Sequence, residues 1–214
     1  MAPPEPPQDC ALCPRLVEFR RANADAYPDW HNAPVASFGP EAARLLIVGL
    51  APGLRGANRT GRPFTGDYAG DLLYETLTEF GFAAGRYEAR PDDSLRLKDC
   101  MITNAVRCVP PENKPVGAEA NACRPFLVSR ISALPKLAAI VCLGKLAHDN
   151  TLRALGQKLS AFPFGHGATA EIETDGRSFA LFDSYHCSRY NTNTGRLTPE
   201  MFKAVFKKVR AFLG

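Results

Sequence analysis

The sequence contains no apolar stretch that is long enough to cross a membrane. Its apolar runs, such as residues 45–50 and 137–143, have the length of single strands, whereas a membrane-spanning helix needs about 20 residues. The first residues, Met-Ala-Pro-Pro-Glu-Pro-Pro, have neither the basic start nor the apolar stretch of a secretion signal. We therefore expect a cytoplasmic protein with no membrane partner.

The sequence also lacks a large excess of charge of either sign, because 26 basic and 22 acidic residues leave a net charge of only +4. Such a mild excess is weak evidence for a nucleic-acid partner by itself. The chain has no repeat and no evident linker, and its 45% hydrophobic and 22% charged residues are typical of globular proteins. The sequence thus predicts one domain over residues 1–214, with a flexible, proline-rich stretch at 1–9.

Strand and helix patterns alternate along the chain, which indicates a parallel sheet covered by helices on both faces. Strands are expected at 45–50, 100–106, 139–143 and 179–182, and helices at 14–24, after Gly70, at 117–131, at 145–155 and after Thr198. Residues 156–177 are rich in glycine, proline and small residues, so we expect a long excursion there that could contain a hairpin.

A glycine-rich, basic loop follows the first strand and carries a single acid, Asp67. Open parallel sheets bind ligands at the carboxyl ends of their strands, where this loop begins. Its arginines suit phosphates, and the flat ring of Phe64 suits a base. The combination predicts an enzyme that acts on a nucleotide.

Two further polar groups follow later strands and should reach the same edge of the sheet. Asn104 can read the edge of a base with its amide, although an asparagine that caps a turn is the alternative. His186 opens a loop over residues 184–196 that is rich in hydrogen-bonding side chains, and a structural hydrogen bond is its alternative role. Together, the acid, the amide and the imidazole predict one site.

Four of the seven cysteines have a spacing that allows a metal or cluster site. Cys10 and Cys13 form a Cys-x-x-Cys pair, while Cys108 and Cys123 lie far downstream. Thiols in a cytoplasmic protein bind metals more often than they form structural disulfides, but cysteine is also a common core residue. We interpret the other three as ordinary thiols: Cys100, Cys142 and Cys187.

Two rival functions remain at this point. A nucleotide hydrolase or transferase is disfavoured because the loop lacks the Gly-Lys-Ser/Thr of a P-loop. The second rival is a non-catalytic iron–sulfur protein that binds DNA or senses damage. A site that keeps Asp67, Asn104 and His186 together disfavours mere binding.

Motifs distributed over nearly the whole chain resemble those of the family 5 uracil-DNA glycosylases. They lie at 49–52, at 56–67, at Asn104 with Cys108, at 186–189 and at 191–198. Family 4 enzymes are close relatives but carry an acid at the position of Leu50. Two departures are Cys187, where the family usually has proline, and Gly53, where it often has alanine.

The resemblance implies a three-layer α/β/α sandwich with a central four-stranded parallel sheet. It also implies a 4Fe-4S cluster whose ligands would be Cys10, Cys13, Cys108 and Cys123. The implied activity is the removal of uracil and other deaminated bases, such as hypoxanthine, from double- or single-stranded DNA during base-excision repair. Such an enzyme would be a monomer associated with the bacterial nucleoid through its substrate.

The resemblance also assigns roles to single residues. Asp67, His186 and Asn104 would be catalytic: Asp67 would stabilise the sugar cation and orient water, and His186 would donate a hydrogen bond to the departing base. The substrate-binding residues would be Gly49, Ala51, Phe64, Tyr68, Asn104, Ser188, Arg189 and Tyr190. Arg189 or Tyr190 would fill the gap in the duplex, and Tyr68 or Asp67 would exclude thymine. No lysine falls in the motifs, so we expect no strand cleavage.

Overall fold

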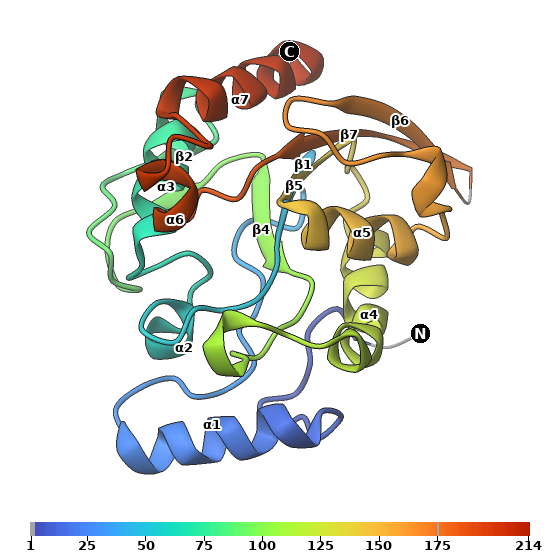
Figure 1. Cartoon of the computed structure of the whole chain (residues 1–214). Coiled ribbons are helices and arrows are strands. Elements are labelled where there is room, and N and C mark those ends of the chain that lie inside the picture. The colour runs from blue at the N-terminus through green and yellow to red at the C-terminus, as the bar shows by residue number, and fades with distance from the viewer. Residues whose placement is uncertain (1–2, 175) are drawn as a thin grey trace.

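Five strands form the central sheet of the computed structural model, which describes residues 3–174 and 176–214 (Figure 1). Their order across the sheet is β4-β1-β5-β7-β6. The bounds of these strands are β1 Leu45–Gly49, β4 Cys100–Asn104, β5 Ala139–Leu143, β6 Thr169–Thr174 and β7 Arg177–Ser184.

Four of these strands run parallel, as the alternating pattern of the sequence predicts. β1 pairs with β4 on one side and with β5 on the other, and β5 pairs with β7. β6 adds an antiparallel edge strand beside β7, through six paired residues from Thr169↔Phe182 to Thr174↔Arg177. The segment expected as an excursion therefore contributes a fifth strand to the four that were predicted.

Helices cover both faces of the sheet, which confirms the predicted three-layer α/β/α architecture (Figure 1). The helices are α1 Pro14–Ala26, α2 Ala57–Thr60, α3 Tyr68–Glu79, α4 Gly117–Ser132, α5 Lys145–Ala154, α6 Arg189–Asn193 and α7 Pro199–Leu213. Two 3₁₀ turns, η1 Pro111–Asn113 and η2 Leu159–Ala161, and a small ladder of β2 Ala83–Ala84 with β3 Arg96–Leu97 complete the fold. In the described ranges, no helix is both long and apolar enough to span a bilayer.

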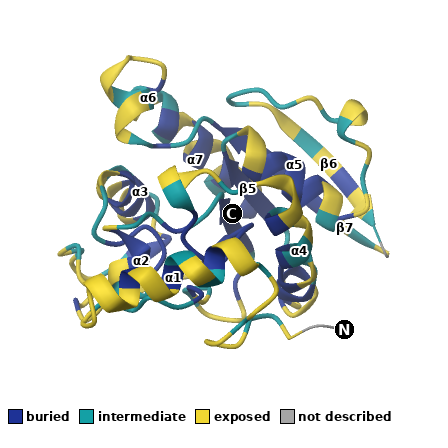
Figure 2. Ribbon diagram, turned by 60° about the horizontal axis from the view of Figure 1, so that its bottom comes forward, coloured by how far each residue is buried: buried dark blue, intermediate teal, exposed yellow. Residues whose placement is uncertain are grey.

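The alternation of side chains along β1 produces two separate cores. Leu45 and Ile47 pack on one face against α3 and α7, while Leu46 and Val48 pack on the other against α4 and α5. The buried layers lie between the helices and the sheet (Figure 2). The apolar stripe of α7 is buried as its spacing predicts.

The parallel strands end at one edge, and backbone hydrogen bonds continue beyond them to fix the loops. Past β4, the amides of Ala105 and Val106 donate to the carbonyls of Gly49 and Leu50, both at 2.9 Å. This pairing holds the chain after β4 against the chain after β1. The loops that carry the predicted site residues are therefore assembled by the sheet itself.

The N-terminal stretch that we expected to be flexible includes an anchored residue, Glu5. Its carboxylate accepts hydrogen bonds from Arg107 and Arg130, with a 2.6 Å contact to the latter. The two arginine side chains are 1% and 5% exposed. Burial is the largest single effect on the pKa of Glu5 and raises it, but the two arginines and a hydrogen bond from Ser37 together outweigh burial, so the pKa is lowered. Glu5 thus neutralises two buried cations that no other carboxylate contacts as closely among the described residues.

Replacing Glu5 with glutamine should lower the free energy of unfolding by about 2–4 kcal/mol, because it leaves the buried Arg107 without a counter-charge and Arg130 with only Glu41, at 3.5 Å. Urea unfolding of the two proteins measures the difference. Glu112→Gln is the matched control, since Glu112 pairs with Lys114 on the surface and both side chains are 79% exposed; it should cost less than about 1 kcal/mol. Equal effects of the two substitutions would contradict the role assigned to Glu5.

Candidate active site

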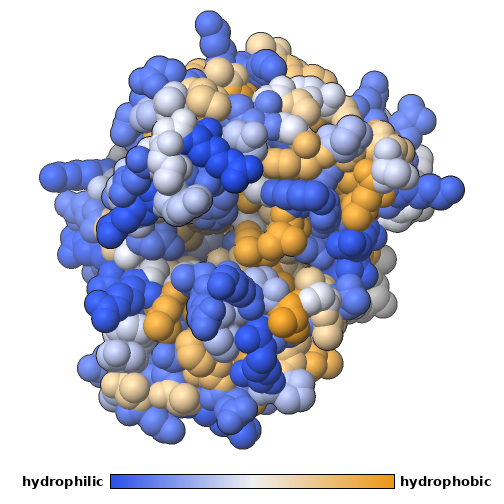
Figure 3. Space-filling view, in the orientation of Figure 1, coloured by the Kyte–Doolittle hydropathy of each residue, from blue (hydrophilic) through white to orange (hydrophobic). Residues whose placement is uncertain are grey.

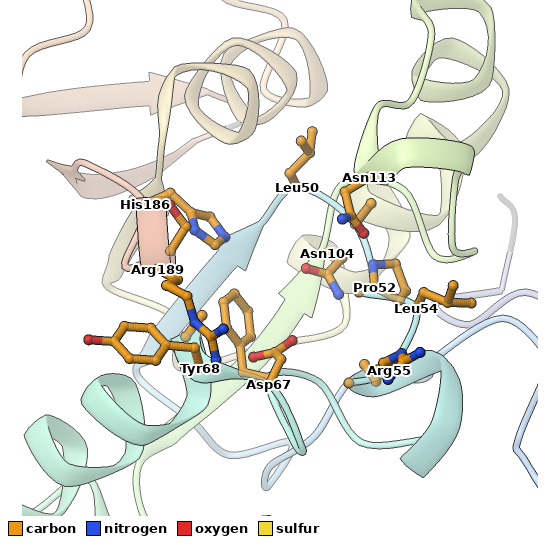
Figure 4. Close-up of a pocket in the computed structure, with 17 residues that line it drawn as sticks. Leu50, Pro52, Leu54, Arg55, Asp67, Tyr68, Asn104, Asn113, His186 and Arg189 are labelled. Carbon is orange, nitrogen blue, oxygen red and sulfur yellow. The ribbon is translucent and has the colours of Figure 1, made fainter. Parts of the chain in front are cut away.

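A cavity of about 610 Å³ opens at the carboxyl edge of the sheet, where the loops after β1, β4 and β7 meet (Figure 4). Its walls come from three segments that are far apart in the sequence. The lining residues are Leu50, Ala51, Pro52, Gly53, Leu54, Arg55, Gly56, Ala57, Phe64, Asp67, Tyr68, Ala69, Asn104, Asn113, His186, Ser188 and Arg189.

Most of the residues predicted for the site line this one cavity. Asp67, Asn104 and His186 lie together there, with Ala51, Phe64, Tyr68, Ser188 and Arg189 around them. Two predicted residues do not line it. Gly49 lies behind the side chains of Phe64 and Asn104, and Tyr190 stands outside with 72% of its surface exposed.

Phe64 forms a wall of the cavity in a backbone conformation that is unusual for its residue type. It is 6% exposed and has a φ of 52°, in the left-handed region that bulky residues avoid. Tyr87 donates a hydrogen bond to the carbonyl of Phe64 at 3.2 Å, and Tyr74 donates to that of Pro63 at 2.6 Å. These two tyrosines hold the strained turn, so that the ring of Phe64 stays at the cavity wall.

Asp67 caps the N-terminus of α3 and faces the cavity with its carboxylate (Figure 4). It accepts a hydrogen bond from the backbone amide of Gly70 at 3.2 Å. A Cβ atom at Gly56 would collide with its Oδ2, so that the carboxylate has room only because the facing residue is glycine. Burial raises the pKa of Asp67, with a smaller contribution from Asp71 and opposition from nearby backbone amides. The result is a carboxylate with increased basicity.

Asn104 ends β4 and is 3% exposed. Its Oδ1 atom is buried and has no hydrogen-bond partner within the described part of the chain. A buried acceptor without a donor is costly, and a ligand that offers an N–H group in the cavity would satisfy it. A Cβ atom at Gly49, the last residue of β1, would collide with this oxygen. The neighbouring strand β1 therefore has to end in glycine.

His186 is half-buried and faces the cavity from the side of β7 (Figure 4). Its ring lies 5.8 Å from that of Phe64, at an interplanar angle of 28°. Burial lowers its pKa to about 4, so the imidazole is neutral at physiological pH. Its Nδ1 atom is also buried without a partner among the described residues, which leaves it free for a ligand.

The turn after His186 is fixed by three contacts. Asn191 donates from its amide to the carbonyl of His186 at 2.8 Å, and Ser188 caps α6 by accepting from the amide of Asn191. Cys187, at the position where the resemblance leads us to expect proline, is fully buried and its thiol lies 3.4 Å from the carbonyl of Ala69. The cysteine therefore connects the turn of His186 to the helix that Asp67 caps.

The arginines near the cavity have different roles. Arg189 lies over the ring of Tyr68, 5.3 Å from its centroid, and Tyr68 points its hydroxyl away from the cavity (Figure 4). Arg62, by contrast, is buried and pairs with Asp93 through two hydrogen bonds of 2.7 and 2.8 Å. It supports the glycine-rich loop and is unavailable to a phosphate.

Nine residues of the cavity wall were not among those predicted for the site: Leu50, Pro52, Gly53, Leu54, Arg55, Gly56, Ala57, Ala69 and Asn113. All of them except Asn113 lie within residues 50–69, a segment that the sequence singles out as a whole. Asn113 comes from η1, and both it and Glu112 have positive φ values, of 57° and 54°. The Pro110-Pro111 pair before it indicated only a break, so no local signal placed Asn113 at the cavity.

The four cysteines of the predicted cluster line a single small cavity beneath α1. Cys10, Cys13, Cys108 and Cys123 share it with apolar side chains such as Leu16 and Phe126. All four are free thiols. Within the described ranges no group of three or more His, Cys, Asp or Glu side chains is arranged to hold a metal ion, but four thiols around one apolar cavity are compatible with an iron–sulfur cluster. Burial, and in lesser part the other thiols, raise the pKa of Cys13 to about 11, so a cationic centre would stabilise their thiolates.

Comparison with known proteins gives one consistent result. A model of the uracil DNA glycosylase superfamily matches residues 36–210. The chain is 44% identical to the type-5 uracil-DNA glycosylase of Thermus thermophilus over 210 residues, which cover 96% of this chain and 94% of that protein. It is 41% identical to the type-5 enzyme of Mycobacterium tuberculosis, over 96% and 78% of the two chains. A type-4 uracil-DNA glycosylase of Archaeoglobus fulgidus is 32% identical over 71% of this chain and 69% of its own.

Replacing His186 with glutamine should flatten the pH dependence of stability between pH 6.5 and 4. The imidazole has a pKa of about 4 in the folded protein against an ordinary value of 6.5, so the unfolded chain binds the extra proton in this window and stability falls as the pH falls. At about 1.4 kcal/mol per pKa unit, wild type should lose up to about 3 kcal/mol more than the variant. Urea unfolding at several pH values measures this, and parallel curves would show that His186 titrates normally.

Proposed function

The chain belongs to the type-5 branch of the uracil DNA glycosylase superfamily, and on this basis we propose that it hydrolyses the N-glycosidic bond of uracil in DNA. The observation that carries the proposal is the meeting of Asp67, Asn104 and His186 in one cavity. The bond lies inside the duplex, so the nucleotide must leave the base stack to reach these groups. The chain thus acts as a base-excision repair enzyme on double- or single-stranded DNA.

Phe64 and Asn104 bind the extruded base. The ring of Phe64 stacks on one face of the base, and its strained backbone keeps it in place before the base arrives. Asn104 holds the edge, where its unpartnered Oδ1 accepts from an N–H group of uracil. Binding therefore satisfies a polar atom that the free protein leaves unpaired.

Asp67 and His186 act on opposite sides of the breaking bond. As the bond lengthens, the sugar becomes positive and the base negative. The carboxylate of Asp67 stabilises the sugar cation and accepts a proton from the attacking water, whose oxygen forms the new bond to the sugar carbon. His186 is neutral, and it donates a hydrogen bond from its imidazole N–H to the base anion.

The same cavity suits bases other than uracil, and it suits base removal without cleavage of the DNA strand. Its volume of about 610 Å³ leaves room for a purine such as hypoxanthine. No lysine lines it among the described residues, so no amine is at hand to form a covalent adduct with the sugar. The enzyme is therefore monofunctional and releases an intact strand with an abasic site.

Tyr190 is the residue that fills the gap in the duplex. It is 72% exposed and lies outside the cavity on α6, where its ring can enter a base stack. Arg189 is held over Tyr68 and lines the cavity, so it closes the side of the pocket.

The four cysteines would bind a 4Fe-4S cluster as a structural element. Cys108 lies four residues after Asn104, and the backbone between them is hydrogen-bonded to the loop after β1. When bound, the cluster would supply four iron–thiolate bonds that join the N-terminal segment to this part of the site. Cys10, Cys13, Cys108 and Cys123 are the ligands that the chain offers.

Asp67→Asn should reduce the rate of uracil excision by about a hundredfold or more under single-turnover conditions, because the amide can neither carry the charge nor accept the proton. Asp71→Asn, one turn further along α3 and outside the cavity wall, is the control and should act within about twofold of wild type. A loss below threefold for Asp67→Asn would exclude its catalytic role. A wild-type protein that binds uracil-containing duplex without releasing base would instead favour the damage sensor.

Cys108→Ser should remove the iron and the associated visible absorbance from protein purified anaerobically, since a cluster of this type needs four thiolates. Cys142→Ser is the matched control, because Cys142 is equally buried but lies in β5 away from the other thiols. Iron that is absent from wild type, or retained in Cys108→Ser, would overturn the ligand assignment while leaving the glycosylase proposal intact.

A further inference from the structure

A second groove lies beside the cavity, between the start of α4 and one face of α5. It has a volume of about 280 Å³ and shares Leu50 with the cavity wall. On α5 it is lined by Leu146, Asn150 and Arg153, whose spacings of four and three residues place them on one helix face. The remaining lining residues are Pro115, Val116, Gly117, Ala120 and Asn121.

Two arginines of this region have no carboxylate partner among the described residues. Arg153 is exposed and lines the groove, while Arg124 is joined to the groove residue Asn121 by a hydrogen bond. Burial, and then the positive charge of Arg153, lower the pKa of Arg124, which shows that the two cations lie close enough to repel each other. An anion bound between them would remove that repulsion.

The acids of the same helices are already paired and do not neutralise these arginines. Glu119 on α4 accepts from Arg15 at 2.7 Å, and Asp149 on α5 accepts from Lys145 at 2.7 Å. No acid lines the groove in the described structure. The groove therefore has an excess of positive charge.

Two buried polar atoms here lack partners within the described ranges. The Nε atom of Arg124 has no acceptor, and the Oδ1 atom of Asn150, in a residue that is 5% exposed, has no donor. A ligand with both kinds of group would satisfy them, and a nucleotide carries phosphate oxygens together with N–H groups on its bases.

Apolar side chains stand beside this charge. Val116 is 48% exposed and Leu146 is 52% exposed. The face of the molecule that Figure 3 shows has hydrophobic patches around a central hollow. Sugars and base edges offer apolar atoms next to phosphates, so the mixed character of the groove suits a nucleic-acid strand.

We propose that this groove binds the sugar–phosphate backbone of DNA that flanks the damaged nucleotide, with Arg124 and Arg153 on phosphates and Val116 and Leu146 against sugars. The proposal rests on the proposed function, because a duplex that delivers a base to the cavity must lie across its mouth. α6, which carries Tyr190, lies to the left of the sheet in Figure 1, whereas α4 and α5, which line the groove, lie to its right. The groove therefore continues the DNA-binding surface away from α6.

The first test compares the salt dependence of binding to an undamaged duplex. The double variant R124Q/R153Q should bind about tenfold more weakly, and its slope of log K against log salt should be smaller by about 1 to 2, because up to two phosphate contacts are lost. The control K98Q/K136Q removes two exposed charges that lie before β4 and β5, at the opposite edge of the sheet. It should keep the wild-type slope.

The second test adds a negative charge to the groove without touching an arginine. Leu146→Glu should weaken binding about tenfold, whereas Phe212→Glu, at a residue with a similar exposure of 54% on α7, should leave affinity within about twofold of wild type. If both arginine and lysine pairs change the slope alike, or if both glutamate variants bind alike, the groove does not bind DNA.

Single-turnover excision at saturating protein separates this proposal from the proposed function. R124Q/R153Q should then release uracil at a rate within about twofold of wild type, because neither arginine lines the cavity. If R124Q/R153Q releases uracil clearly more slowly than wild type at saturating protein, the proposal that the groove acts only in DNA binding is wrong. If wild type excises no base, the proposed function fails, whereas the slopes on undamaged duplex still decide the groove.

Discussion

The cavity depends on the close approach of its side chains to the backbone of two glycines, Gly49 and Gly56. At Gly49 a single added carbon would collide with both the amide of Asn104 and the ring of Phe64, and at Gly56 it would collide with the carboxylate of Asp67. An alanine at either position would therefore displace a side chain of the cavity to which we assign a role in binding or catalysis. Space is therefore the reason for glycine at Gly49 and Gly56, whereas Gly61 and Gly66 of the loop have φ values of 75° and 86°, in the region that favours glycine.

Rigid support for this arrangement comes from buried polar contacts outside the cavity. Arg62 and Asp93 are 6% and 0% exposed at their side chains and pair through two hydrogen bonds. Arg62 also lies over the rings of Tyr74 and Tyr87, the same tyrosines that hold the backbone at Phe64. Breaking this ion pair would leave a charge buried without a partner, so the loop has little freedom to relax. The strain at Phe64 is sustained because its surroundings fix it from several directions.

Much of this architecture could be predicted because it follows from local patterns. The parallel sheet is indicated by short apolar runs that alternate with helical periodicity, and residues that follow strands meet at one edge by topology alone. Asp67, Asn104 and His186 were found in this way. Asn113 was not found, because the sequence of η1 indicates only a break. The anchor at Glu5 was not found either, because Glu5 meets Arg107 and Arg130 more than one hundred positions later. The antiparallel edge strand β6 was expected only as part of a possible hairpin. Polar residues such as Glu171 and Glu173 leave it without the apolar pattern of a buried strand.

Burial acts on the two titratable groups of the cavity in ways that complement each other. It raises the pKa of Asp67 and lowers that of His186 to about 4, in each case because a low-dielectric site disfavours the charged form. A protonated imidazole would offset the charge of the carboxylate across the cavity. Because the imidazole stays neutral, the charge of Asp67 would remain available to a positive sugar in the mechanism that we propose, while the histidine would still have an N–H to donate to the leaving base. In that mechanism one physical effect accounts for both the anionic role proposed for Asp67 and the neutral donor role proposed for His186.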